Sequence, residues 1–241
     1  MSDKTTPNKQ QLEVAKRAEN PSFSDLDFFR EILRRKDDSI CEWYATRALG
    51  DLRDFKADKL LLEVLTEPDV KVGESSLHLV CARSIGRLGP EMLRKIAKLL
   101  DHPREETRIA AIDSLGELRH PGGIELLYPF LSSGSEKEVL WTTLSLAKIG
   151  KESIPVLKEA IESQGESTAI LCFDALLLIN GSKARDAIFS IFRKFPKLVK
   201  VYFQRMKIRR GVEFRKRLEE ELAEGGEKRK QAQEMLSILE T

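Results

Sequence analysis

Apolar residues recur along this chain at spacings of three and four, which is the period of an α-helix with one buried face. The pattern is clear in Cys41, Tyr44, Ala45, Ala48 and Leu49. Long runs of strictly alternating apolar and polar residues, which are typical of half-buried strands, do not occur in the sequence. The pattern therefore predicts an all-α fold.

One short sequence motif, which we call the repeated phrase, recurs along the chain. In it, small residues precede an apolar residue, which is followed by Gly or a polar residue. The apolar residue of this phrase stands at Leu49, Ile85, Leu115, Ile149 and Ile179, and the register continues to Ile208 and Ile238. A period near 30 residues indicates stacked supersecondary units, because one unit alone cannot bury its apolar face.

Each unit is predicted to contain two helices. The first helix carries the repeated phrase and ends near a Gly, the residue preferred just past a helix C-terminus. First helices are expected near residues 39–50, 74–87, 104–117, 136–149, 167–179, 197–209 and 227–239. Six second helices alternate with them, with Pro90, Pro121 and Pro155 at or near their first turns, where a missing N–H is tolerated. Pro129 falls inside a second helix, where we expect a kink.

A helix pair is predicted before the first repeat, at residues 11–19 and 23–36. Ser24 with Asp27 three places on predicts a capping box at the start of the second of these helices, with Asp in place of the usual Glu or Gln. Residues 1–8 are expected to form a loose tail.

The repeats are expected to form a single domain over residues 9–241, with about six and a half two-helix units after the N-terminal pair. They are clear over residues 39–195 and diverge into a basic C-terminal part over residues 196–241. The chain is therefore expected to form one continuous array of repeats.

One unit resembles a known repeat. Residues 107–118 read TRIAAIDSLGEL and are followed by Pro121 and by Leu126-Leu127. This order of an Arg–apolar pair, an Ala–Ala pair, Leu-Gly and a Pro-led second helix with Leu-Leu resembles the HEAT-like repeat of the phycobilisome-lyase type. The resemblance implies a right-handed α-α superhelix, a HEAT-like solenoid, whose second helices line the concave face. The family includes chromophore lyases, metal-dependent hydroxylases and adaptors, so the resemblance implies a fold and not one activity.

The composition is that of an ordinary globular protein. The 241 residues include 41 Lys and Arg against 39 Asp and Glu, a net charge of +2, which argues against a chain that coats nucleic acid or membrane along its whole length. The longest apolar runs, such as residues 176–179, are far shorter than the roughly 20 residues of a spanning helix. The polar N-terminus lacks the apolar stretch of a secretory signal, so the sequence predicts a cytoplasmic protein.

Positive charge is concentrated in residues 193–217, which we call the basic segment. It holds 11 basic residues and one acid, Glu213, whereas the rest of the chain has a net charge of −8. On the helix near residues 197–209, the residues expected to face the core are Leu198, Val201, Tyr202 and Met206. Those expected to face solvent are Lys197, Lys200, Lys207 and Arg210. Three aromatic residues, Phe195, Phe203 and Phe214, stand among these cations in the sequence. The segment is either a patch for an anionic partner or a solvated face in which Arg215, Lys216 and Arg217 pair with Glu219, Glu220 and Glu221.

The favoured interpretation is a non-catalytic scaffold or adaptor that binds a partner protein with an acidic surface. The contact is expected at the concave face and at a C-terminal patch that comprises Arg193, Lys194, Lys197, Lys200, Lys207, Arg209, Arg210 and Arg215. One alternative is a nucleic-acid-binding protein that uses the same segment. A second is a bilin lyase or bilin chaperone subunit, which would need an aromatic-lined pocket with cations for the propionates. Head-to-tail self-association through the separated charges is also compatible with the sequence.

No catalytic residue, metal ligand or cofactor is predicted. The hydroxylase branch of the family is built on repeated His-Glu pairs, and none of the three histidines is followed by Glu. His102 and His120 precede prolines in predicted loops, and His78 is predicted to be a satisfied, half-buried helix residue. Cys41, Cys81 and Cys172 lie far apart in apolar segments and are predicted to be reduced core residues. Trp43 and Trp141 are predicted to pack between helices.

Overall fold

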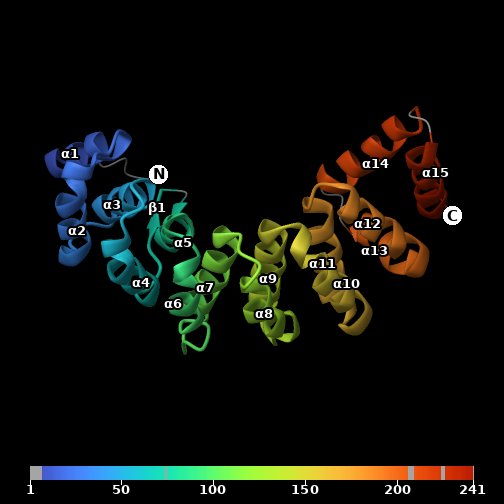
Figure 1. The fold of residues 1–241 in the computed structure, drawn as a ribbon, viewed down its shortest axis with the longest axis horizontal. Helices are drawn as coiled ribbons and strands as arrows, with labels where there is room; N and C mark the ends of the chain where they lie inside the picture. Colours follow the sequence, from blue (N-terminus) through green and yellow to red (C-terminus); the bar gives the residue numbers. More distant parts are fainter. Residues whose placement is uncertain (1–6, 74, 206–208, 224–225, 241) are drawn as a thin grey trace, which may run out of the picture. The chain divides into compact units, whose positions relative to one another are not determined.

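The structure is a computed structural model that describes residues 7–73, 75–205, 209–223 and 226–240 (Figure 1). Within these residues the chain forms fifteen α-helices, of which α1 (Lys9–Glu19) and α2 (Leu26–Arg35) are the N-terminal pair. The first helices of the repeats are α3 (Ser39–Asp51), α5 (Leu77–Leu88), α7 (Glu105–Leu118), α9 (Glu136–Ile149), α11 (Glu166–Leu178), α13 (Pro196–Arg205) and α15 (Gly226–Glu240). The second helices are α4 (Asp58–Thr66), α6 (Leu93–Ala97), α8 (Gly123–Leu127), α10 (Ile154–Ser163), α12 (Ser182–Lys194) and α14 (Arg209–Glu221). The all-α prediction and the order of the helices are confirmed.

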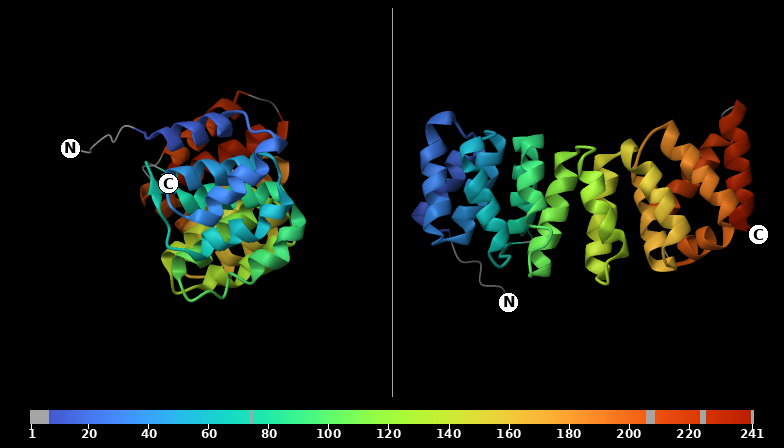
Figure 2. Two further views of the ribbon diagram at one scale, coloured as in Figure 1. Left: turned by 90° about the vertical axis from the view of Figure 1, so that its left-hand side faces the viewer. Right: turned by 60° about the horizontal axis from the view of Figure 1, so that its bottom comes forward.

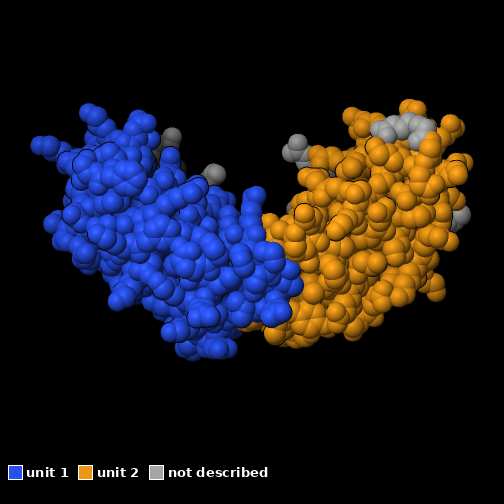
Figure 3. Space-filling view, viewed as in Figure 1, with its two compact units in different colours: residues 1–127 blue, residues 128–241 orange. Residues whose placement is uncertain are grey.

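The helices fall into two compact units, residues 1–127 and residues 128–241 (Figure 3). In the first unit α3 packs against α5 and α5 against α7, whereas in the second unit α11 contacts α9, α10, α12 and α13. Helices that follow one another lie side by side within each unit (Figure 2). The single domain over residues 9–241 stays a prediction.

The entry to α2 differs from the prediction. Ser22, and not Ser24, begins the capping interaction: the carboxylate of Asp25 accepts hydrogen bonds from the backbone N–H of Ser22 at 3.1 Å and from its hydroxyl at 2.7 Å. A 3-10 turn over Phe23–Asp25 then leads into α2. The predicted box at Ser24 and Asp27 was wrong because the chain turns two residues earlier.

A short hairpin in the connection between α4 and α5 was not predicted. β1 (Lys71–Val72) pairs antiparallel with β2 (Ser75–Ser76), with Lys71 opposite Ser76 and Val72 opposite Ser75. Gly73 has a φ of +63°, which suits a tight turn. Because of the hairpin, the first helix of the second repeat begins at Leu77 and not at residue 74, where it was expected.

Pro129 marks a change of helix type and not a kink. The α-helix α8 ends at Leu127, and residues Tyr128–Ser132 form a 3-10 helix. Proline has no N–H with which to continue the i to i−4 ladder, and its ring clashes with the carbonyl of residue i−4, so the α-helix ends before Pro129. The prediction of a kinked helix was wrong in this respect.

Glycines at the ends of the first helices serve helix packing. Gly50 and Gly86 were expected just past a C-terminus, but both lie inside their helices. A Cβ on Gly50 would lie 2.5 Å from the Cβ of Ser84, and one on Gly86 would lie 2.8 Å from the carbonyl carbon of Glu117. The small residues therefore let the backbones of neighbouring first helices approach closely. Gly150, with a φ of +99°, is the C-cap of α9 as the sequence predicted.

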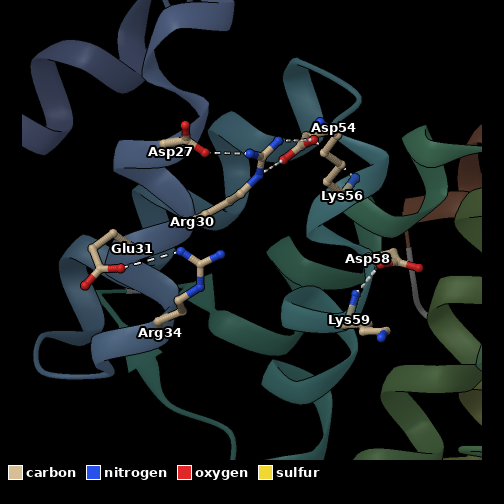
Figure 4. Close-up of polar contacts among 8 residues, drawn as sticks. All are labelled: Asp27, Arg30, Glu31, Arg34, Asp54, Lys56, Asp58 and Lys59. Atoms are coloured by element: carbon tan, nitrogen blue, oxygen red, sulfur yellow. Dashed lines mark hydrogen bonds and ion pairs between the residues drawn. The ribbon is translucent and has the colours of Figure 1, made fainter.

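An ion pair with little solvent exposure joins the N-terminal helix pair to the first repeat (Figure 4). The Arg30 guanidinium on α2 donates two hydrogen bonds to the Asp54 carboxylate, both of 2.7 Å, and a third of 2.7 Å to Asp27. The Asp54 side chain is 4% exposed and that of Arg30 is 11% exposed, whereas Asp27 is almost fully exposed. This pair fixes the position of α2 against the start of α4.

Candidate partner-binding surfaces

The basic segment begins at the end of α12, where its cations pair with acids on other helices. Arg193 lies 3.1 Å from Glu234 on α15, and Lys194 lies 2.8 Å from Glu162 on α10. All four side chains are substantially exposed, so each pair contributes little stability. The two predicted binding residues are at the surface, but their charges are partly compensated within the second unit.

The cations on α14 pair along their own helix, as one of the two predicted interpretations requires. Arg215, Lys216 and Arg217 lie 3.5, 3.9 and 3.4 Å from Glu219, Glu220 and Glu221, respectively. Arg215 also lies 3.6 Å from Glu240 on α15. The predicted pairs one turn apart are confirmed.

The predicted apolar face of α13 is rotated. Val199 and Tyr202 are buried, whereas Leu198 and Val201 are only partly buried and Met206 lies outside the described residues. Tyr202 donates a hydrogen bond of 2.7 Å from its hydroxyl to the Asp174 carboxylate on α11. The core around Asp174 thus selects the face of α13 that carries this tyrosine.

The lysines of α13 differ from the cations on α12 and α14. Lys197 is exposed and Lys200 is partly buried, and neither has an ion pair with any residue that the structure describes. Lys207 and the side chains of Arg209 and Arg210 lie outside the described part of the chain. Unpaired positive charge in the described part of the segment therefore lies on α13.

Two of the three interleaved aromatic residues, Phe203 and Phe214, pack inside the second unit. The rings of Phe192, Phe203 and Phe214 form a cluster with centroid separations of 6.0 to 6.2 Å. Tyr202 packs edge-on against Phe173 at 4.9 Å. Stacking on nucleic-acid bases requires exposed ring faces, and these rings are engaged with one another instead. The interleaving in sequence did not indicate this packing.

A network that the sequence did not indicate ties α12, α14 and α15 together. Arg185 pairs with the buried Glu221, donates a hydrogen bond of 3.0 Å to the Gln231 side chain and donates another of 3.2 Å to the carbonyl of Lys228. Arg217 shares Glu221 with Arg185. Two guanidinium groups therefore face one carboxylate.

A cleft of about 370 Å³ lies beside α14, and we call it the α14 cleft. It is lined by Leu177, Leu178, Asn180, Glu213, Phe214 and Arg217. A smaller cavity shares Leu177, Phe214 and Arg217 with it and reaches Arg185 and Met235. The cleft thus places apolar side chains next to a guanidinium.

A larger groove of about 610 Å³ lies between the first turns of α9 and α11. Its lining is mostly apolar or hydroxylic and comprises Ser133, Gly134, Glu136, Lys137, Val139, Leu140, Ser167, Thr168, Ile170 and Leu171. Leu140 is 41% exposed. The tryptophans Trp43 and Trp141, which the bilin alternative would need in a pocket, are partly buried and line neither this groove nor the α14 cleft.

The cysteines and the loop histidines occupy the structural positions expected of them, whereas His78 was expected to be half-buried and is buried. His78 is buried with its Nε2 3.0 Å from the carbonyl of Glu67, and the loop residues His102 and His120 accept hydrogen bonds from nearby backbone N–H groups. The three cysteines are buried free thiols, as predicted. Among the described residues no group of three or more His, Cys, Asp or Glu could hold a metal ion.

The thiols are expected to be unreactive in the folded protein. Burial raises the pKa of Cys41 to about 11 and that of Cys172 to about 12, and burial also raises the pKa of Cys81. Since the thiolate is the nucleophile, Ellman's reagent at pH 8 should modify no cysteine in native buffer and all three in 8 M urea. Rapid modification of one thiol in native buffer would contradict the burial described above.

Residues 93–176, which include the unit singled out by its sequence, match the family model for HEAT repeats. This part of the chain is similar to HEAT repeats, so the predicted HEAT-like repeat is confirmed there. No curated protein matches this chain. No helix in its described part is long and apolar enough to cross a bilayer.

Solved structures similar to this chain share little sequence with it. The complex of CpcE and CpcF of phycocyanin lyase from Nostoc sp. PCC7120 has 15% identity over 100% of this chain and 97% of that chain, with a TM-score of 0.43. An engineered protein has 18% identity over 90% of this chain and 96% of that chain, with a TM-score of 0.40. A designed armadillo repeat protein in complex with the peptide (KR)4 has 15% identity over 96% and 100%, with a TM-score of 0.38.

Proposed function

We propose that this protein is a non-catalytic repeat scaffold that binds a partner protein with an acidic surface through the basic segment. The observation that carries the proposal is the pair Lys197 and Lys200. These lysines lack ion pairs with described residues, although the other cations of the segment whose side chains are described have them. An excess of positive charge at a surface favours an anionic partner and accelerates its association.

The packing of the aromatic rings favours a protein over a nucleic acid as that partner. Sequence-tolerant binding of single strands combines a basic groove with exposed aromatic platforms, and Phe203 and Phe214 pack against Phe192 instead. Second helices are expected to line the concave face of such a repeat array, and α12 and α14 are second helices, whereas Lys197 and Lys200 lie beside them in the chain on α13, a first helix. The predicted cations Arg193, Lys194 and Arg215 would add to the contact, and the side chains of Arg209 and Arg210 lie outside the described part of the chain.

The proposal is tested by reversing the two lysines. Lys197→Glu/Lys200→Glu should weaken binding of the partner by at least about tenfold, since it replaces two positive charges at the contact by two negative ones. The partner is first captured from the native host with the wild-type chain, and its affinity is then measured with purified proteins by isothermal titration calorimetry. Thermal melting checks that the variant remains folded, and Lys197→Glu alone serves if it does not.

Lys71→Glu/Lys98→Glu is the matched control. It makes the same change in net charge with two exposed lysines of the first unit that have no ion pair with described residues. Equal binding by both double variants would reject the basic segment as the contact. Capture of a nucleic acid that nuclease treatment removes would support the alternative function.

A further inference from the structure

We propose that the α14 cleft is a docking site for an acidic peptide segment of a partner protein, with one apolar side chain in the cleft and an adjacent carboxylate on Arg217. The inference deepens the proposed function, on which it rests, because it names the kind of segment recognised and the residues that recognise it. It also assigns a role to a residue, Leu178, that lies outside the basic segment.

The apolar part of the cleft comes from two helices. Leu177 and Leu178 end α11, and Phe214 lies on α14. Leu178 is 38% exposed although it is a large apolar residue, and Phe214 is only partly buried. The volume of about 370 Å³ is within the range of roughly 300 to 1,000 Å³ that is usual for binding sites. The cleft can therefore accept an apolar side chain and remove it from water.

Arg217 supplies the group that would bind a carboxylate. Its side chain is 59% exposed, and its Nε lies 3.4 Å from Glu221, which also pairs with Arg185. Since two guanidinium groups share this one carboxylate, its negative charge does not neutralise both. Arg217 donates no hydrogen bond to any described residue, so its planar guanidinium can bind a carboxylate of a ligand with two parallel hydrogen bonds.

The charge along α14 gives the preferred sign of the ligand. From residue 209 to residue 217 the helix holds five basic residues and one acid, Glu213, which also lines the cleft. Arg215 and Lys216 pair with Glu219 and Glu220 one turn on, whereas Arg217 has only a share of Glu221, which also pairs with Arg185. The excess positive charge at the cleft is therefore that of Arg217, and it attracts a carboxylate and repels a basic side chain.

The cleft is unsuited to recognition of bases by stacking, because the Phe214 ring packs 6.0 Å from Phe192 and 6.1 Å from Phe203. A nucleic acid could contact the cations, but none of these rings offers an exposed face on which a base could stack. The combination of an apolar cleft and a guanidinium favours a peptide in which a Leu, Ile, Met or Phe stands beside Asp or Glu.

The test uses a phage-displayed library of random 12-residue peptides, selected against the full-length protein at 150 mM NaCl. We expect the selected peptides to share an apolar residue next to Asp or Glu and to carry net negative charge. Selection of no peptide, or of peptides without acidic residues, would overturn the proposal.

The strongest selected peptide is then labelled with fluorescein, and its Kd is measured by fluorescence anisotropy. Arg217→Gln and Leu178→Ser should each weaken binding by about tenfold, the size expected for loss of a bidentate charged contact or of an apolar anchor. Both side chains are exposed, so neither change is expected to disturb the fold.

Each variant has a control on α14. Lys216→Gln removes a cation that pairs with Glu220 and does not line the cleft, and Val212→Ser removes an apolar side chain that is 65% exposed outside the cleft. These controls should change the Kd by less than about twofold, since isolated exposed contacts contribute little. Peptide affinity that is equal in Arg217→Gln and Lys216→Gln would overturn the role of Arg217. Displacement of the peptide by a 12-nucleotide oligo(U) RNA that also depends on Arg217 would assign the site to nucleic acid.

The two proposals fail in different ways. If the native partner is lost in Lys197→Glu/Lys200→Glu but retained in Leu178→Ser, the basic segment is the contact and the cleft is not. If the selected peptide instead requires Leu178 and Arg217 while the native partner still binds after the two lysine reversals, the cleft is a peptide-binding site. In that case the two lysines do not contribute to partner binding.

Discussion

Asp54→Ala is expected to lower the free energy of unfolding by about 3 kcal/mol, the low end of the range for breaking a buried ion pair. The change leaves the Arg30 guanidinium, whose side chain is 11% exposed, without its two hydrogen bonds of 2.7 Å to Asp54. Asp27 remains as a partner for Arg30, which is why the upper end of the range is not expected. Urea denaturation followed by far-ultraviolet circular dichroism measures the difference.

Two further variants separate the buried pair from the exposed one. Asp27→Ala removes an almost fully exposed carboxylate and should cost less than about 1 kcal/mol. Arg30→Met/Asp54→Leu replaces the pair by apolar side chains and should recover much of the loss, because desolvation of the two charges is then avoided. If Asp54→Ala costs no more than Asp27→Ala, the pair does not hold α2 in place.

Gly86→Ala is expected to destabilise the protein by about 2 kcal/mol, the usual cost of overpacking. In an ordinary helix interior the same change stabilises by roughly 0.5 to 1 kcal/mol, so even the sign of the result is informative. The physical reason is the close approach of α5 and α7: the new Cβ would lie 2.6 Å from the Cβ of Glu117 and 2.8 Å from its carbonyl carbon and oxygen. The backbone of α7 cannot give way as the end of a flexible side chain could.

Gly134→Ala is the matched control for Gly86→Ala. A Cβ at Gly134 would meet nothing within 4 Å, and this glycine has no positive φ. Its melting temperature should equal that of the wild type within about 1 °C. A Gly86→Ala variant that melts at or above the wild-type temperature would show that the neighbouring first helices can separate without cost.

The sequence allowed the helices to be placed because their signal is local. The boundaries of α9, expected at 136–149 and observed at Glu136–Ile149, follow from the apolar spacing and from Gly150 at the C-terminal end, and the structure adds an N-cap at Ser135. The capping box at α2 could not be placed as well, since Ser22 with Asp25 and Ser24 with Asp27 have the same spacing. Only the structure shows that the 3-10 turn at Phe23–Asp25 uses the first of these pairs.

The face of α13 could not be predicted for a similar reason. Apolar residues stand at Leu198, Val199, Val201, Tyr202 and Phe203, so more than one stripe satisfies the helical period. The Tyr202 hydroxyl donates a hydrogen bond to the Asp174 carboxylate, and the Tyr202 ring packs against Phe173. These two contacts determine which face of α13 is buried. These partners lie on α11, about one repeat earlier in the sequence.

By itself, the sequence determined that this is an all-α protein of two-helix repeats near 30 residues with its positive charge gathered in residues 193–217. Periodicity and charge counts are properties of neighbouring residues, and they need no knowledge of the fold. The tertiary structure alone decided that Arg193 and Lys194 meet Glu234 and Glu162, that Gly86 faces the backbone of Glu117, and that Leu178 and Arg217 share a cleft. Each of these contacts joins residues from different helices, and their positions depend on how the repeats pack.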